Sequence, residues 1–152
     1  MLCHKRLRKE LQSLGKERDP FITLANDPDN ILHWTALITG PQQSVYEGYR
    51  FKLSIRVTAD YPHAPPMIAF MTRIFHPNVS TSGEICLDIL KKEWSPAWTL
   101  QAACRAIMML LENPEPDSPL NCDAGNIIRA GDQRAYRSMV RFYCEEYAEK
   151  FF

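Results

Sequence analysis

Cys86 lies between two segments that are rich in turn-forming and aromatic residues. His76-Pro77-Asn78 precedes it, and Trp94-Ser95-Pro96-Ala97-Trp98 follows it. A cysteine outside a disulfide is usually a small buried hydrophobe. A thiol held between two loops can instead be partly exposed and reactive. Cys86 is therefore the candidate nucleophile of this chain.

The histidine upstream of Cys86 has two interpretations. A cysteine hydrolase attacks an amide and needs a histidine beside the thiol as general base, and His76 could fill that role. Its place in a turn, directly before Pro77, favours a histidine that holds the loop by hydrogen bonds. The residues alone leave both interpretations open.

The order of these motifs, with Gly83-Glu84-Ile85-Cys86-Leu87-Asp88 between them, resembles the core of the ubiquitin-conjugating enzymes. The resemblance spans nearly the whole chain. It implies that Cys86 receives the C-terminus of ubiquitin from a ubiquitin-activating enzyme and carries it as a thioester. Exchange between two thioesters is nearly balanced, so no strong base is required, and the resemblance implies a mainly structural His76. It also implies no metal and no bound cofactor, because ATP is used by the activating enzyme.

Two further residues are expected to act when an acceptor amine attacks the thioester. Negative charge then develops on the carbonyl oxygen, and an amide donor such as Asn78 would stabilise it by roughly 3 kcal/mol. The same side chain could hold a turn, and the family's asparagine is credited with both roles. The amine must be neutral to attack, and Asp117 on a proline-rich loop could orient it or take its proton. Many family members carry this acid one position later, where this chain has Ser118, so an ordinary surface aspartate is the alternative.

The resemblance also implies a platform for a RING-type ubiquitin ligase. In the family it is formed by the first helix, a proline-rich loop and the loop that follows the cysteine. Residue by residue, this gives Arg6, Lys9, His63, Ser95, Pro96 and Ala97. A large apolar residue often stands where this chain has His63, which suggests a different ligase preference. The alternative is that the indoles of Trp94 and Trp98 are buried in the core and the loop is merely packing.

Residues 104–107 and 114–123, followed by Gly125-Asn126 and Gly131-Asp132, resemble the peroxisomal branch of the family. That branch attaches ubiquitin to a peroxisomal import receptor so that the receptor can be recycled. The sequence has no apolar run that could span a membrane, no lipidation signal and no terminal peroxisomal address. We therefore expect a cytoplasmic protein, peripheral on the cytosolic face of the peroxisome and held by a membrane-anchored tethering protein without inserting into the bilayer.

Other functions compete with this hypothesis. The chain could carry another ubiquitin-like modifier such as SUMO, serve as a general cytosolic ubiquitin carrier, or be an inactive variant that only assists another carrier. Inactive variants usually lack the cysteine, and Cys86 and Asn78 are both present. A charging assay with different activating enzymes separates these alternatives and the Cys–His hydrolase.

The surrounding pattern predicts an α+β fold. Leu7, Leu11 and Leu14 recur at helical spacing, and strands are expected at residues 21–24, 31–39, 49–57 and 67–70, separated by turn formers. Consecutive strands with short connections predict a four-stranded antiparallel meander. Residues 60–66 contain three prolines and should form a rigid loop, in which a cis X-Pro bond is plausible.

The second half of the chain is expected to be mainly helical. Helices are predicted at residues 100–112, with Thr99 as N-cap, at 122–130, ended by Gly131, and from a cap at Asp132 to about residue 150. Together these elements give an N-terminal helix, the meander sheet, the cysteine loop and C-terminal helices, which is the ubiquitin-conjugating fold.

Composition supports one catalytic domain over residues 1–152. The chain has 152 residues, 45% of them hydrophobic, which is enough for a single core. Its 18 basic residues balance 18 acidic ones, so charge gives no argument for nucleic acid as a partner. Five cysteines, an odd number, contain no Cys-x-x-Cys pair, so neither a disulfide framework nor a zinc site is expected.

Overall fold

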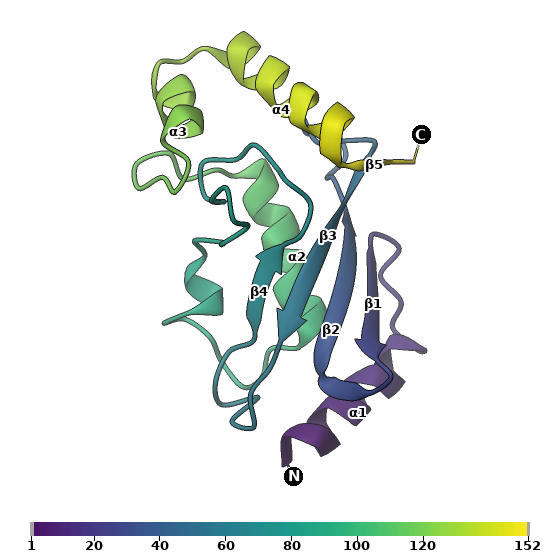
Figure 1. The fold of residues 1–152 in the computed structure, drawn as a ribbon. Coiled ribbons are helices and arrows are strands. Elements are labelled where there is room, and N and C mark those ends of the chain that lie inside the picture. The colour runs from purple at the N-terminus through teal and green to yellow at the C-terminus, as the bar shows by residue number, and fades with distance from the viewer. Residues whose placement is uncertain (1, 152) are drawn as a thin grey trace.

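The computed structural model describes residues 2–151, which form an antiparallel sheet flanked by helices (Figure 1). The strands β1 (Ile22–Asp27), β2 (Asn30–Thr39), β3 (Tyr49–Arg56) and β4 (Met67–Phe70) are neighbours in chain order. Each pairs antiparallel with the next, which confirms the predicted meander.

The sheet has a fifth strand that the sequence analysis did not predict. β5 (Glu149–Lys150) pairs with β3 at Tyr49 and Arg50. β4 pairs only with residues 53–56 of β3, so the start of that strand keeps an open edge. The expectation of a last helix reaching residue 150 is therefore wrong, because the chain becomes extended at Ala148 and joins this edge.

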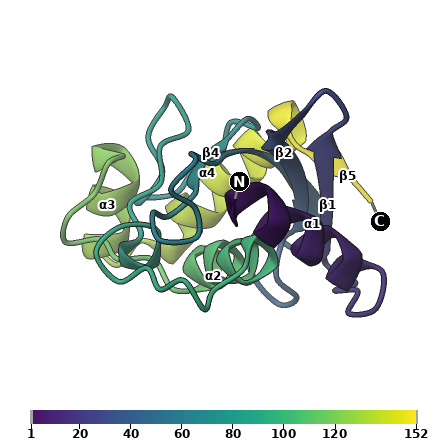
Figure 2. The same ribbon diagram turned by 90° about the horizontal axis from the view of Figure 1, so that it is seen from below.

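Helices close the two ends of the sheet and cover one of its faces. The helices are α1 (Leu2–Leu14), α2 (Leu100–Glu112), α3 (Cys122–Arg129) and α4 (Gln133–Tyr147), with a short 3-10 helix at Asp88–Leu90. α1 lies at one end of the molecule and α3 and α4 at the other, while α2 crosses the sheet between them (Figures 1 and 2). The predicted caps are confirmed, since the side chain of Thr99 accepts a hydrogen bond from Ala102 and that of Asp132 from Ala135.

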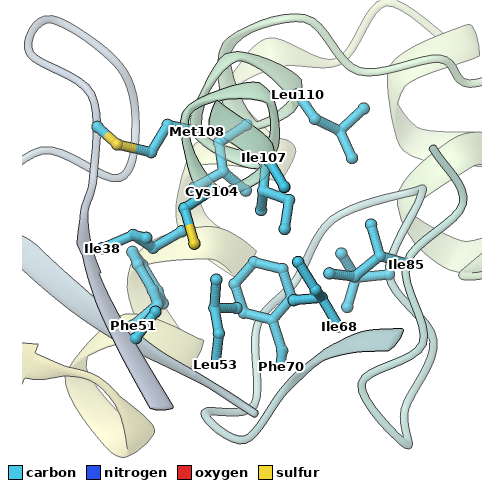
Figure 3. Packing of buried hydrophobic residues seen from close by; sticks show 14 of the residues in the cluster. Ile38, Phe51, Leu53, Ile68, Phe70, Ile85, Cys104, Ile107, Met108 and Leu110 are labelled. Atoms are coloured by element: carbon cyan, nitrogen blue, oxygen red, sulfur yellow. The ribbon is translucent and has the colours of Figure 1, made fainter. Parts of the chain in front are cut away.

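The core fills the space between α2 and the sheet (Figure 3). Alternate residues of β3 are buried while its remaining residues are half-buried or exposed, as expected for a sheet with one face on the core. Side chains from both layers meet there, among them Ile38, Phe51, Leu53, Phe70, Cys104, Ile107 and Met108. This packing fixes α2 and the strands as a frame for the loops.

α1 buries a different stripe from the predicted one. Leu7 is buried, but Leu11 is 39% exposed and Leu14 is only half-buried. The buried stripe is Cys3, Leu7 and Glu10, which have the helical spacing i, i+4, i+7. The apolar pattern therefore placed the helix correctly but not its inner face, because a charged residue belongs to that face.

Candidate active site

A tight turn carries Cys86 to the surface. Val79 and Ile85 form an isolated antiparallel bridge, and Gly83 turns the chain between them with a φ of +91°. A Cβ atom at Gly83 would lie 2.1 Å from the carbonyl oxygen of Phe70, so only glycine fits this turn. Ile85 is buried in the core (Figure 3), which leaves Cys86 half-buried as a free thiol.

His76 is fully buried and holds the loop before Cys86. Its Nδ1 accepts a hydrogen bond of 3.0 Å from the backbone N–H of Asn78, so Nε2 carries the proton and donates to the carbonyl of Leu110 at 2.9 Å. Burial lowers the pKa of His76 from its ordinary value of 6.5 to about 4, although the bond to Leu110 acts in the opposite direction. Both ring nitrogens are therefore occupied by backbone contacts, one in the loop and one in α2, and neither is free to take a proton from Cys86.

Asn78 joins the cysteine segment to the proline-rich loop. Its carbonyl accepts a hydrogen bond of 2.9 Å from the backbone N–H of Cys86. Its buried side chain makes two bonds of 2.8 Å with the backbone of Glu115, donating through Nδ2 and accepting through Oδ1. The donated bond uses one of the two N–H groups of the amide. The side chain thus holds a loop in this structure, and its second N–H is the one that an oxyanion would need.

The two hydrogen bonds between Asn78 and Glu115 hold the loop that carries Asp117 beside the cysteine segment. The same loop is fixed again where the N–H groups of Leu120 and Asn121 donate to the carbonyl of Pro77, at 2.8 and 3.0 Å. Asp117 lies between these two attachments and is exposed. Asp117 is therefore an exposed residue on a loop whose backbone is held at both sides.

The six residues predicted to form the ligase platform come from three segments that contact one another. Arg6 on α1 donates through both terminal guanidinium nitrogens to the carbonyls of Pro96 and Trp98, each at 2.8 Å. The indole of Trp94 donates to the carbonyl of Pro62 at 2.7 Å, next to His63. The exposed members of the platform are Lys9, His63, Pro96 and Ala97, while Arg6 and Ser95 are half-buried.

Neither tryptophan of the loop is fully buried. Trp94 is half-buried and packs against the core, and Trp98 is 38% exposed. The alternative that this loop is ordinary core packing is therefore wrong for Trp98. The preceding loop contains a cis peptide bond between Tyr61 and Pro62, as the proline content suggested.

Sequence reasoning missed two buried residues that connect the platform, Glu10 and Tyr61. They hydrogen-bond each other at 2.5 Å, although they belong to α1 and to the loop before β4. The one available signal was the position of Glu10 three residues after Leu7 on the same helical face.

A family model described as ubiquitin-conjugating enzyme matches residues 6–144. The fold and the cysteine site agree with it, and the chain belongs to the ubiquitin-conjugating enzyme family. Members of this family are enzymes that transfer ubiquitin through a thioester, which makes this chain a transferase of the ubiquitin conjugation pathway.

The more specific likeness is to peroxin-4 proteins. The chain is 55% identical to Protein PEROXIN-4 of Arabidopsis thaliana over 141 residues, covering 91% of this chain and 90% of that protein. It is 47% identical to the ubiquitin-conjugating enzyme E2 pex4 of Dictyostelium discoideum, covering 93% and 97%. A crystal structure of H. polymorpha Pex4p in complex with the soluble domain of Pex22p superposes with a TM-score of 0.92, with 39% identity, covering 96% of this chain and 98% of that one.

Proposed function

We propose that this enzyme accepts ubiquitin on Cys86 and, with a RING-type ligase, transfers it to a peroxisomal import receptor so that the receptor is recycled. The observation that carries the chemical part is the position of Asn78. One residue fixes the backbone of Cys86 through its carbonyl and the loop of Asp117 through its side chain. The peroxisomal part is supported by the identity to peroxin-4 proteins along nearly the whole chain.

Charging in this proposal is an exchange between two thioesters. Sγ of Cys86 attacks the ubiquitin carbonyl held on the cysteine of the activating enzyme, so one C–S bond forms and another breaks. The proton lost by Cys86 is balanced by the one that the departing thiolate takes up. The step requires an accessible sulfur and no bound cofactor, and the half-buried Cys86 provides that access.

Discharge in this proposal uses the two residues beside Cys86. An acceptor amine attacks the thioester carbonyl, and the second N–H of Asn78 donates to the oxyanion that forms. The exposed carboxylate of Asp117 orients the amine and receives its proton. The intermediate then collapses with Cys86 leaving as a thiolate. His76 keeps the loop in place and moves no proton.

The enzyme needs a partner to reach the peroxisomal membrane. No helix within residues 2–151 is long and apolar enough to cross a bilayer. The H. polymorpha relative was crystallised with the soluble domain of Pex22p. We propose that a membrane-anchored protein of this kind tethers the present chain, at a surface away from Cys86 and the loop of residues 94–98.

The exposed aromatic flank of α4 is the surface that best fits such a tether. Phe142 is 60% exposed and Tyr147 is 42% exposed. Tyr143 lies between them, with ring centroids 6.1 and 5.7 Å away. A contiguous exposed apolar surface of this type is typical of a protein contact, and α4 lies at the opposite end of the molecule from α1 (Figure 1).

Localisation of a tagged protein tests the peroxisomal part of the proposal. The protein should be peripheral on peroxisomes and become diffuse when its anchor is deleted, because the tether alone raises its concentration at the membrane. The variant Cys86→Ala should keep the normal location. A uniformly cytosolic distribution, together with normal receptor recycling after deletion of the enzyme, would leave only general ubiquitin transfer.

A further inference from the structure

Glu10 is a buried carboxylate in α1 whose partners belong to three different segments. Its Oε2 atom accepts hydrogen bonds from Nε of Arg6 at 3.1 Å and from the hydroxyl of Tyr61 at 2.5 Å. Its Oε1 atom accepts from the backbone N–H of Leu100 at 2.7 Å. Only 8% of Glu10 is exposed, so this charge has been removed from water and is compensated by these three donors.

The location of Glu10 explains why a carboxylate is stable there. Leu100 is the first residue of α2, where the backbone N–H groups have no partner within the helix. Glu10 takes one of them, and the N-cap Thr99 takes the N–H of Ala102. The positive end of the helix dipole and the guanidinium of Arg6 both favour a negative charge at this point.

Two contacts lead from Glu10 to the loop of residues 94–98. In the first, Nε of Arg6 donates to Glu10, while the other two guanidinium nitrogens of Arg6 donate to the carbonyls of Pro96 and Trp98. In the second, the hydroxyl of Tyr61 donates to Glu10, and the centroid of the Tyr61 ring lies 6.1 Å from that of Trp94. Arg6 is thus largely occupied inside the protein and is less free to serve as a separate ligase contact than its charge suggested.

We propose that Glu10 is a positioning residue that sets the conformation of the 94–98 loop for the ligase. The carboxylate holds the guanidinium of Arg6 in an orientation that reaches two carbonyls of the loop. It also anchors the first turn of α2, directly after the loop. The assignment of this loop to ligase binding rests on the proposed function, but the contacts from Glu10 to the loop do not.

Amide hydrogen exchange on the uncharged enzyme tests the contacts without any partner. Glu10→Gln keeps the size of the side chain, but its amide would present N–H groups to donors and lose the charge that holds Arg6. The amides of Ala97 and Trp98 should then exchange about tenfold faster, while those in β2 and β3 stay protected. The matched control is Glu17→Gln, an exposed carboxylate in the turn after α1 that lines the same pocket as Glu10.

Arg6→Lys is the second variant, and it keeps the test decisive if Glu10→Gln folds poorly. Lysine retains the positive charge but cannot reach both carbonyls. Arg6→Lys should speed exchange of the same two amides. In the double variant these amides should exchange no faster than in the more affected single variant, because both substitutions act on one hydrogen-bond network. Unchanged exchange at Ala97 and Trp98 in both single variants would overturn the proposal.

Kinetics then separate a positioning role from general damage. The probe is a RING domain first selected because it stimulates ubiquitin discharge from the wild-type enzyme. For Glu10→Gln the KM for this RING domain should rise about tenfold, with little change in the rate at saturating RING and in discharge to free lysine without RING. A parallel fall in unstimulated discharge would contradict the proposal. If no RING domain stimulates the wild-type enzyme, the ligase part of the proposed function fails, and hydrogen exchange still decides the role of Glu10.

Discussion

At the scale of single residues, Asn78 connects the backbone of Cys86 to the loop that carries Asp117. Asn78→Ala should accept ubiquitin nearly normally, because charging does not depend on the amide. Discharge to free lysine should slow by roughly 10²-fold, because the oxyanion loses its donor. Single-turnover discharge at saturating lysine measures this effect.

A second substitution removes both N–H groups of the Asn78 side chain and keeps its acceptor oxygen. Asn78→Asp keeps an oxygen that can accept from the N–H of Glu115, but it loses the N–H that donates to the Glu115 carbonyl and offers none to an oxyanion. It should therefore discharge as slowly as Asn78→Ala. A normal rate for Asn78→Ala would leave only the loop-holding role.

His76 gives the protein a pH-dependent stability. The unfolded chain has a histidine pKa of 6.5, while burial lowers that of folded His76 to about 4. Between these pH values the unfolded state binds the proton more readily. The contribution of His76 to the free energy of unfolding is therefore complete above pH 6.5 and is lost as the pH falls toward 4. Its full size is about 3 kcal/mol.

Urea unfolding at a series of pH values measures this contribution. His76→Gln should be less stable at neutral pH and should lose less stability than the wild type between pH 6.5 and 4. His63→Gln, at an exposed histidine, should keep the wild-type profile. Identical profiles for the wild type and His76→Gln would contradict the assignment.

At the scale of elements, the two hydrogen bonds of Arg6 join α1 to the 94–98 loop. Ala97→Asp adds a charge at an exposed position of the platform without changing a side chain that binds Arg6. Ligase-stimulated discharge should fall at least about tenfold while unstimulated discharge persists, because a charge at the centre of a contact is costly. Arg6→Glu is a less clean probe, since it also removes the bonds to Pro96 and Trp98. Unchanged stimulation of Ala97→Asp would exclude this loop from the ligase contact.

The helices and strands that the sequence predicted are those specified by local patterns. α2 was predicted with its correct bounds because its apolar spacing and the cap at Thr99 are local features. β5 was missed because two residues carry no alternating pattern, and their pairing depends on an edge of β3 about a hundred residues earlier. In the site, Cys86 and Asn78 were predicted from their motifs, and the structure joins their backbones by a hydrogen bond. Glu10 was missed because its partners Tyr61 and Leu100 are distant in sequence.

At the scale of the whole molecule, the proposed contacts are separated by location. α1, which carries two residues of the predicted ligase platform, lies at one end of the molecule, and α4 lies at the other (Figure 1). Phe142→Asp should therefore release the enzyme from peroxisomes in cells without slowing its charging, because Phe142 is 60% exposed and packs little against the core. Met109→Asp, at a residue of α2 that is 58% exposed, is the matched control and should stay at the peroxisome. Retention of Phe142→Asp would move the tether to another surface.

The most direct test of the account is charging of the purified enzyme with ubiquitin, activating enzyme and ATP, followed by non-reducing and reducing gels. The account predicts a shifted band that collapses with a thiol reductant. The band should persist in Cys122→Ala, which changes another exposed cysteine, and be absent in Cys86→Ala. Cys86→Ser should give at most an ester that resists the reductant. Charging of Cys86→Ala together with its loss in Cys122→Ala would contradict the central claim that Cys86 carries ubiquitin.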